Sequence, residues 1–217
     1  MNKALSSLRI TEIFYSLQGE STYVGLPTVF IRLTGCPLRC DYCDTAYAFT
    51  GGKKISLENI MDQVKTYSCK TVCITGGEPL SQPGVHTLMK HLCDEGYRVS
   101  IETSGALSIK AIDQRIMIVM DLKTPASKES SKNDLSNLAY LKPSDQIKFV
   151  LCNRDDYEWA CTMITTYRLT DQCEVLFSPS YETLNPTTLA QWILQDNLCV
   201  RFQLQLHKIL WNDAQGH

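Results

Sequence analysis

The sequence has no long apolar run and no strong excess of charge of either sign. Its 217 residues include 21 Lys and Arg against 23 Asp and Glu, a formal net charge of −2. A chain so nearly neutral lacks the broad positive field that holds nucleic acid or anionic membrane, so we expect neither as a partner. No stretch approaches the roughly 18 apolar residues of a membrane-spanning helix, and the opening MNKALSSLRI lacks the apolar centre of a signal peptide. We therefore expect a soluble, cytoplasmic protein.

Internal repeats and low-complexity tracts are also missing. With 44% hydrophobic and 20% charged residues, the chain can bury an ordinary globular core, which excludes disorder and collagen. The most polar stretch, Ser127–Asn133, is expected to be an exposed loop and not a linker between domains. The sequence therefore predicts one domain over residues 1–217.

Short β-type runs alternate with helical patterns, which is typical of a parallel sheet with crossover helices. The expected strands are Thr28–Leu33, Thr71–Thr75, Arg98–Glu102, Ile116–Asp121, Gln146–Leu151, Glu174–Phe177 and Arg201–Leu206. The expected helices are Leu57–Tyr67, Gly84–Glu95, Ile109–Gln114, Asp134–Tyr140, Asp155–Thr166 and Pro186–Gln195. Ser56 and Asn185 are expected to cap two of these helices. About six βα units in a row predict a partial or full barrel, or an open doubly wound sheet, with the strand C-termini on one side.

The ten cysteines are compatible with either a disulfide framework or reduced thiols. Three of them, Cys36, Cys40 and Cys43, fall within the eight residues CPLRCDYC, too close for efficient pairing among themselves. The other seven are scattered singly, and we expect each to be a small buried hydrophobic residue. These seven are Cys69, Cys73, Cys93, Cys152, Cys161, Cys173 and Cys199.

The spacing of the three clustered cysteines, CxxxCxxC, indicates a metal or cluster site. Thiolates bind zinc or iron–sulfur clusters, but a structural zinc site normally has four protein ligands, and no second cysteine pair is present to complete it. A [4Fe–4S] cluster held by three cysteines leaves one iron without a protein ligand. That iron can bind S-adenosylmethionine, and electron transfer can then cleave the sulfonium to a 5′-deoxyadenosyl radical. Zinc is the alternative.

A second motif, TGGEP, follows the expected strand Thr71–Thr75 at residues 75–79. Its two glycines allow close approach of the backbone to a ligand, and the following carboxylate or peptide groups can accept a hydrogen bond from an ammonium group. Alone it could be a simple tight turn. Beside the cysteine loop it indicates a clamp for the cofactor.

These motifs together resemble the radical S-adenosylmethionine superfamily. Further segments narrow the resemblance: IFYSLQGE from Ile13, Arg32, CDT from Cys43, IETSG from Ile101, DLKTP from Asp121 and QLHK from Gln205. From about residue 8 to about residue 212 the chain is similar to the 7-carboxy-7-deazaguanine synthases. The resemblance implies an α/β fold, a modified and incomplete (βα) TIM-type barrel, in a homodimer. It also implies conversion of 6-carboxy-5,6,7,8-tetrahydropterin to 7-carboxy-7-deazaguanine with loss of ammonia, a step of queuosine and 7-deazapurine biosynthesis.

The same resemblance assigns the site residues. Those implied to contact the pterin are Leu17, Gln18, Gly19, Glu20, Arg32, Thr75 and His207, of which Glu20, Arg32 and His207 are the catalytic candidates. Those implied to line S-adenosylmethionine are Tyr42, Gly77, Glu78, Glu102, Asp121, Leu122, Lys123, Ser178, Pro179, Ser180 and Tyr181. Cys36, Cys40 and Cys43 would hold the [4Fe–4S] cluster, and Thr45 would bind Mg²⁺. The polar tail from Asn212 onward is assigned no site residue.

The implied mechanism begins when an external one-electron reductant reduces the cluster. The radical then abstracts hydrogen from C6 of the pterin, the ring contracts, and hydrogen returns to regenerate S-adenosylmethionine. Magnesium would fix the substrate carboxylate. The sequence has Ser21 after LQGE where many relatives have glycine, from which we expect a change in loop flexibility alone.

Several alternatives to this assignment remain open at the level of sequence. Arg32 could form a structural salt bridge, Thr45 could be a turn residue, and His207 could be a histidine satisfied at a strand end. The whole chain could instead be an activase that places a glycyl radical on a partner enzyme, or a binding module stabilised by zinc.

Overall fold

The computed structural model describes residues 7–212 and 214–216, which form one nine-stranded sheet in the order β3-β1-β2-β4-β5-β6-β7-β8-β9. Its strands are β1 (Ser7–Leu17), β2 (Pro27–Leu33), β3 (Lys53–Ser56), β4 (Thr71–Gly76), β5 (Arg98–Thr103), β6 (Met117–Asp121), β7 (Gln146–Leu151), β8 (Glu174–Pro179) and β9 (Arg201–Phe202). From β2 to β9 all neighbours are parallel and the order never reverses. The strands at the two edges of the sheet do not pair, so the described chain forms an incomplete barrel and not a doubly wound sheet.

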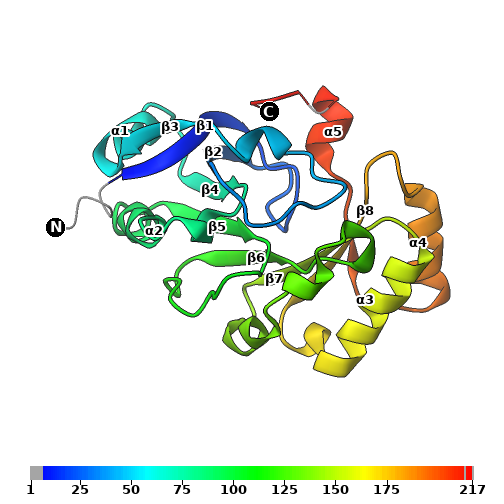
Figure 1. The fold of residues 1–217 in the computed structure, drawn as a ribbon. Helices are drawn as coiled ribbons and strands as arrows, with labels where there is room; N and C mark the ends of the chain where they lie inside the picture. The colour runs from blue at the N-terminus through cyan, green and yellow to red at the C-terminus, as the bar shows by residue number, and fades with distance from the viewer. Residues whose placement is uncertain (1–6, 213, 217) are drawn as a thin grey trace.

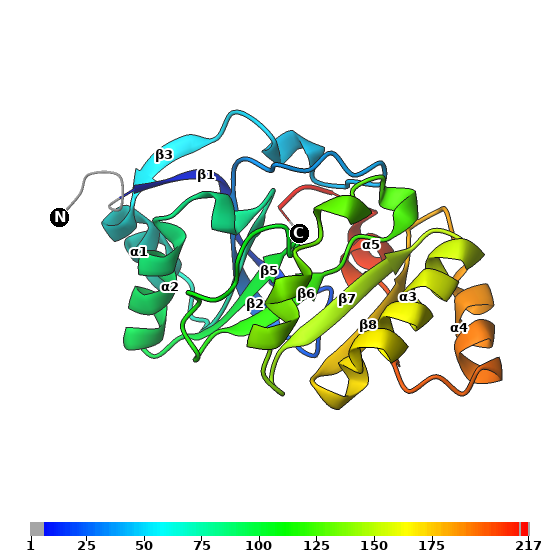
Figure 2. The same ribbon diagram turned by 60° about the horizontal axis from the view of Figure 1, so that its bottom comes forward.

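Helices cover the outside of the curved sheet, as Figures 1 and 2 show. They are α1 (Leu57–Lys65), α2 (Val85–Asp94), α3 (Arg154–Tyr167) and α4 (Pro186–Gln195), whereas α5 (Leu206–Trp211) lies apart from them, near the carboxyl end of the chain. The Ser56 and Asn185 caps are confirmed, since both side chains accept backbone N–H groups of the first helical turn. Buried Val, Ile and Leu side chains of the strands pack against the helices as the main core. No helix in the described ranges is long and apolar enough to cross a membrane.

Two strands were not predicted, β1 and β3. The register of β1 against β2 shifts between Ile10 and Glu12, so its buried positions do not alternate regularly along its whole length. That shift hides the period-2 pattern by which a strand is predicted. β3 has only four residues, and its two lysines are typical of a short edge strand.

The turn after β1 closes the amino end of the barrel. The side-chain amide of Gln203 accepts from Ser21 N at 2.7 Å and donates to Ser21 O at 2.8 Å. The side-chain amide of Gln146 binds the N–H and the hydroxyl of Thr22 in the same way, at 2.9 and 2.7 Å. Ser21 is fully buried with a φ of 66°, the left-handed region that glycine adopts without strain. The expectation that this position affects flexibility alone was therefore wrong, because serine here carries backbone strain.

The predicted strand Arg201–Leu206 is wrong beyond Phe202. The chain leaves the sheet edge there, Gln203 turns to the β1 turn, and Leu206 begins α5. Leu206 N donates to Gly19 O at 3.0 Å, which fixes α5 to the start of the same turn. His207 and Lys208 therefore come from a helix and not from a strand end.

Four smaller predictions also need correction. Residues 109–114 form turns and no helix, and residues 135–140 form a 3₁₀ helix in place of an α-helix. The 127–133 loop is only partly exposed, because Ser127 is fully buried. Of the seven scattered cysteines, Cys73 and Cys173 are buried as predicted, whereas Cys199 is exposed and the other four are half-buried.

Candidate active site

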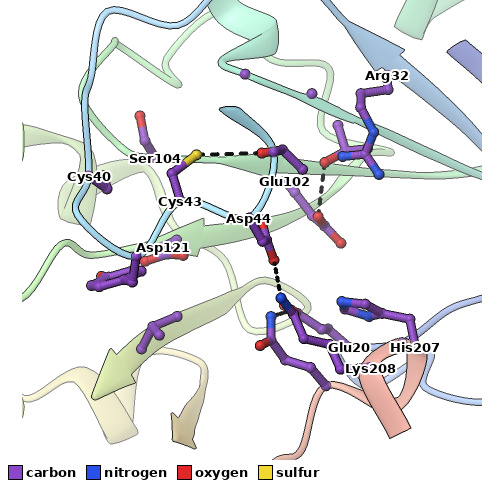
Figure 3. A pocket seen from close by; sticks show the side chains of 18 of the residues that line it. Glu20, Arg32, Cys40, Cys43, Asp44, Glu102, Ser104, Asp121, His207 and Lys208 are labelled. Carbon is purple, nitrogen blue, oxygen red and sulfur yellow. Dashed lines mark hydrogen bonds and ion pairs between the residues drawn. The ribbon is translucent and has the colours of Figure 1, made fainter. Parts of the chain in front are cut away.

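A cavity of about 470 Å³ opens at the carboxyl ends of the parallel strands. Its walls carry the last residues of β2, β4, β5, β6 and β7, the cysteine loop after β2, the turn after β1, and α5 with residues 214–216. Figure 3 shows acidic and basic side chains from these separate elements pointing into one space. This is the side of a βα barrel at which ligands bind.

The three clustered cysteines all line this cavity, and all three are free thiols. Burial raises the pKa of Cys36 and raises that of Cys40 to about 11. Thiols in such surroundings stay protonated unless a cation stabilises the thiolate, so the donor set suits a group that brings positive charge.

The arrangement of these thiols distinguishes a cluster from a single ion. Among the described residues, no three His, Cys, Asp or Glu side chains converge as ligands of one metal ion. A zinc site requires such convergence. In a cubane each cysteine binds a different iron, so the three sulfurs surround the cluster without sharing an ion. The residues present therefore fit a three-cysteine cluster better than they fit zinc.

The TGGEP turn packs closely on the cysteine loop. A Cβ atom added at Gly77 would lie 2.3 Å from Gly35 O and 2.9 Å from the Cβ of Cys36, so only glycine fits there. Glu78 N donates to Gly35 O at 2.8 Å and joins the two segments. Gly76 and Gly77 line the cavity, which places their peptide groups where a ligand can reach them.

The carboxylate of Glu78, in contrast, does not face the cavity. It is fully buried and accepts hydrogen bonds from Leu80 N, Thr103 Oγ1, Ser104 N and Ser104 Oγ at 2.6 to 3.0 Å. Its side chain therefore holds the end of β4 against the end of β5. The sequence analysis named the carboxylate and the peptide groups of TGGEP as possible acceptors for an ammonium group. In the structure, only the peptide groups are placed to accept from a ligand in the cavity.

At the end of β6, Asp121 lies between two lysines. Its Oδ2 is 3.0 Å from Lys123 Nζ and 3.5 Å from Lys148 Nζ. Burial alone would raise the pKa of Asp121, but these two ammonium groups outweigh it and hold the pKa below its ordinary value. Its Oδ1 is buried with no hydrogen-bond partner among the described residues, as is the hydroxyl of Tyr42. Unpartnered buried polar atoms that line a cavity are what a polar ligand satisfies.

Three of the residues expected to line S-adenosylmethionine lie behind the wall instead. Leu122, Ser178 and Pro179 are buried and do not border the cavity, whereas their neighbours Lys123, Ser180 and Tyr181 do. Strand alternation explains Leu122, because the residues on either side of it, Asp121 and Lys123, both line the cavity. Ser178 and Pro179 end β8, and of this segment only the residues that follow them line the cavity.

Glu20 projects into the cavity from the turn after β1. It is 7% exposed, its Oε2 pairs with Lys148, and its Oε1 accepts from Gln205 Nε2 at 2.7 Å. Burial would raise the pKa of Glu20, but Lys148 and His207 hold it below its ordinary value, so the carboxylate is ionised. Sequence reasoning missed Lys148, although a lysine inside the apolar strand QIKFVL is a detectable signal of a buried charge.

Arg32 is held by a structural ion pair while it still borders the cavity. Its Nε donates to Glu12 Oε1 at 2.7 Å, and the hydroxyl of Tyr47 donates to the same oxygen at 2.8 Å. The guanidinium also lies 5.6 Å from the ring centroid of Phe14 and 5.8 Å from that of Tyr47. The structural salt bridge considered as an alternative is therefore present, and it uses Nε. The side chain still lines the cavity, so the contact with substrate stays a prediction.

The remaining predicted substrate residues also border the cavity. Thr75 Oγ1 donates to Glu102 Oε2 at 3.0 Å, and Gln18 Nε2 contacts Glu102 Oε1 at 3.4 Å. A Cβ atom at Gly19 would lie 2.2 Å from Nδ1 of His207, so the bare backbone of Gly19 allows α5 to approach. Leu17, Gly19 and His207 all line the same space.

Thr45 lies beside the last cysteine. Its hydroxyl oxygen is 3.8 Å from Cys43 Sγ, and the residue borders the cavity. The next residue back, Asp44, pairs with Lys208 of α5 at 3.3 Å, which links the cysteine loop to that helix (Figure 3). The structure also brings Ala214–Gly216 to the cavity, a part of the tail to which the sequence assigned no role.

Comparison with known proteins agrees with this geometry. The radical SAM superfamily model matches residues 30–127. The chain is 42% identical to a 7-carboxy-7-deazaguanine synthase of Chlorobaculum tepidum, over 96% of this chain and 97% of that protein. It is 38% identical to a protein of the same name from Thermoplasma acidophilum, over 95% and 99%.

Solved structures show the same fold. The crystal structure of QueE from Escherichia coli aligns with a TM-score of 0.77 at 23% identity, over 93% of this chain and 95% of that one. Streptococcus suis SuiB bound to S-adenosylmethionine aligns with a TM-score of 0.55 at 16% identity, over 82% and 47%. The incomplete barrel predicted from the sequence is thereby confirmed as the fold.

Proposed function

Since the chain belongs to the 7-carboxy-7-deazaguanine synthase family of the radical SAM superfamily, we propose that it converts 6-carboxy-5,6,7,8-tetrahydropterin to 7-carboxy-7-deazaguanine and ammonia. It is a radical SAM lyase of queuosine and 7-deazapurine biosynthesis. The observation that supports this best is the single cavity that holds three free cysteines at one end and the charged pair Glu20 and Lys148 at the other.

Cys36, Cys40 and Cys43 would hold the [4Fe–4S] cluster, and its fourth iron would bind S-adenosylmethionine. When bound, these two groups supply the radical chemistry that removes one hydrogen atom from the substrate and returns it. The peptide groups of Gly76 and Gly77, the unpartnered oxygen of Asp121 and the hydroxyl of Tyr42 provide polar contacts for S-adenosylmethionine. Glu102, Lys123, Ser180 and Tyr181 complete that wall of the cavity.

The chain's own residues bind and orient the pterin. The ionised carboxylate of Glu20 can accept hydrogen bonds from the guanidine-like edge of the pterin, because each of its oxygens has a second lone pair free beside its present contact. Arg32 can use its terminal NH groups for the substrate carboxylate while Glu12 holds its Nε. Leu17, Gln18, Gly19 and Thr75 form the remaining wall, and His207 covers it from α5. Together they fix the substrate and exclude water.

Magnesium is part of this proposal through Thr45. A hydroxyl oxygen is a weak ligand, and Mg²⁺ prefers six oxygen donors of which several are water. Thr45 can supply one of them at the cavity wall, so the substrate carboxylate and water would complete the shell. Bound there, Mg²⁺ would orient the carboxylate and withdraw charge from it.

We further propose that residues 1–217 act as one domain in a homodimer with an external one-electron reductant. The continuous nine-stranded sheet supports the single domain. The need for a reduced cluster supports a cytoplasmic location. A different reductant or quaternary state would leave the assignment of the reaction unchanged.

Anaerobic turnover tests the reaction. Reconstituted protein is incubated with 6-carboxytetrahydropterin, S-adenosylmethionine, Mg²⁺ and a chemical reductant, and 7-carboxy-7-deazaguanine is measured by its absorbance and mass. We expect product together with about four irons per chain, and loss of both in Cys40→Ala. A brown, iron-loaded protein that makes no deazaguanine would refute the substrate and favour an activase. A colourless folded protein with stoichiometric zinc would refute the cluster.

A further inference from the structure

Lys148 is the one lysine of β7, and its ammonium group lies between the two halves of the proposed site. Its side chain is 10% exposed, and the residue as a whole 8%. Nζ pairs with Glu20 Oε2 on one side and lies 3.5 Å from Asp121 Oδ2 on the other. Glu20 belongs to the proposed pterin contacts and Asp121 to the proposed S-adenosylmethionine contacts, so a single cation touches a residue of each.

We propose that Lys148 is a positioning residue that keeps the pterin-binding carboxylate of Glu20 charged and in place, and ties it to Asp121. This inference rests on the proposed function. Lys148 borders the cavity, but its ammonium group is directed at carboxylates of the protein itself. It acts on the substrate through Glu20.

The balance of charge around Lys148 explains why the cation is required. Glu20 is faced by Lys148 from β7 and by His207 from α5, with the neutral amide of Gln205 on its other oxygen. Lys148 is faced by Glu20, Asp121 and Glu102. Without Lys148, Glu20 would face His207 and the neutral amide of Gln205, since Lys123 binds Asp121. A buried carboxylate that loses its ion-pair partner takes up a proton more readily, because burial disfavours its charged form.

Protonation of Glu20 would remove the recognition of the pterin edge. An ionised carboxylate accepts two hydrogen bonds from a pair of N–H donors, whereas a carboxylic acid presents one donor to them. In the wild-type protein the pKa of Glu20 lies below its ordinary value of 4.5, so its charge is constant across neutral pH. In Lys148→Met, burial is no longer opposed by this cation, and the pKa rises.

The test measures binding against pH. Anaerobic holoenzyme with S-adenosylmethionine is titrated with 6-carboxypterin, the oxidised form of the substrate, between about pH 5 and pH 8. In the wild type, we expect the ionisation of Glu20 to cause almost no change in the affinity for 6-carboxypterin over this pH range. In Lys148→Met we expect binding to weaken at acid pH through the uptake of one proton by Glu20. The affinity should fall about tenfold for each pH unit below the raised pKa of Glu20. Lys148→Arg, which keeps the charge, should restore most of the wild-type profile.

Stability against pH gives an independent readout that needs no ligand. In the wild type, Glu20 has a lowered pKa, so its contribution is present above pH 4.5 and is lost as the pH falls. In Lys148→Met the raised pKa reverses the sign, and the variant should lose stability as the pH rises from 4.5 through the new pKa. Adding Glu20→Gln to Lys148→Met should remove most of this loss of stability with rising pH. The double-mutant cycle then isolates the interaction between Glu20 and Lys148.

Lys142→Met is the matched control. Lys142 pairs with the buried Asp145 and donates to Ile116 O at 2.6 Å, outside the cavity. Its loss should lower stability without making pterin binding weaker at acid pH.

If Lys148→Met binds 6-carboxypterin with the wild-type pH profile, or if Lys148→Arg fails as badly as Lys148→Met, the inference is wrong. If the wild-type enzyme makes no deazaguanine, the proposed function fails instead, and the stability cycle still reports whether Lys148 holds Glu20 ionised.

Discussion

The contact between Gly77 and the cysteine loop makes Gly77→Ala an informative substitution. An added Cβ would lie 2.3 Å from Gly35 O, 2.7 Å from Gly35 C and 2.9 Å from Cys36 Cβ. Two of these atoms are backbone, so no side chain can rotate away. Ordinary contact requires the two segments to separate by about 1 Å, which would break the bond from Glu78 N to Gly35 O of 2.8 Å.

We expect Gly77→Ala to lower the free energy of unfolding by about 2–4 kcal/mol. Overpacking costs about 1–3 kcal/mol, and the lost hydrogen bond costs about 1 kcal/mol. The larger effect should be on the cluster, because one of the three atoms that the added Cβ meets is the Cβ of Cys36, and its displacement would move the first thiol out of place. Urea unfolding of the cluster-free protein measures the first effect. Iron and sulfide per chain after anaerobic reconstitution measure the second.

Gly96→Ala provides the comparison. Gly96 follows α2 with a φ of 77°, and an added Cβ there meets no atom within 4 Å. Alanine should cost about 1–2 kcal/mol of backbone strain and leave the iron content unchanged. Wild-type iron content and stability in Gly77→Ala would refute the view that this glycine is required for close approach of the two segments.

Three further substitutions test separate parts of the site. Arg32→Ala should weaken pterin binding by about 2–5 kcal/mol, since the charge pair between Arg32 and the substrate carboxylate is lost. Unchanged affinity would leave Arg32 with its structural bond to Glu12 alone. Thr45→Ala should reduce the Mg²⁺ dependence of turnover while the absorbance of the cluster stays the same, and an unchanged magnesium response would remove Thr45 from the site. Gly19→Ala would place a Cβ 2.2 Å from His207 Nδ1, so α5 should separate from the turn; faster amide hydrogen exchange over 206–211 is the measurement, and wild-type exchange would contradict it.

The sequence predicted the parallel part of the sheet well because its strands are buried on both faces. Gln146–Leu151 has no exposed residue, and the strand was predicted with its observed bounds. Such strands are continuous apolar runs between turn residues, a pattern that depends little on the rest of the fold. The cysteine loop and TGGEP were equally accessible, since their chemistry is encoded in consecutive residues.

The sequence predicted less where a residue's role depends on distant partners. Glu78 belongs to a motif, but only the fold shows that its carboxylate is used by Thr103 and Ser104. Lys148 belongs to no motif, and its importance comes from Glu20, 128 residues away. In the same way Ser21 looks like an ordinary loop residue until its left-handed backbone is seen.

The incomplete barrel explains why the proposed pterin end of the cavity is built from the two ends of the chain. The sheet does not close, and the gap is filled where the turn after β1 meets the segment that leads into α5. The bonds that join them link Ser21 with Gln203 and Glu20 with Gln205, at separations of 182 and 185 residues. Contacts of such long range form only after the intervening strands have paired. Substitutions at this junction should therefore weaken pterin binding before they lower the stability of the sheet, whereas substitutions in the core between β4 and β8 should do the reverse.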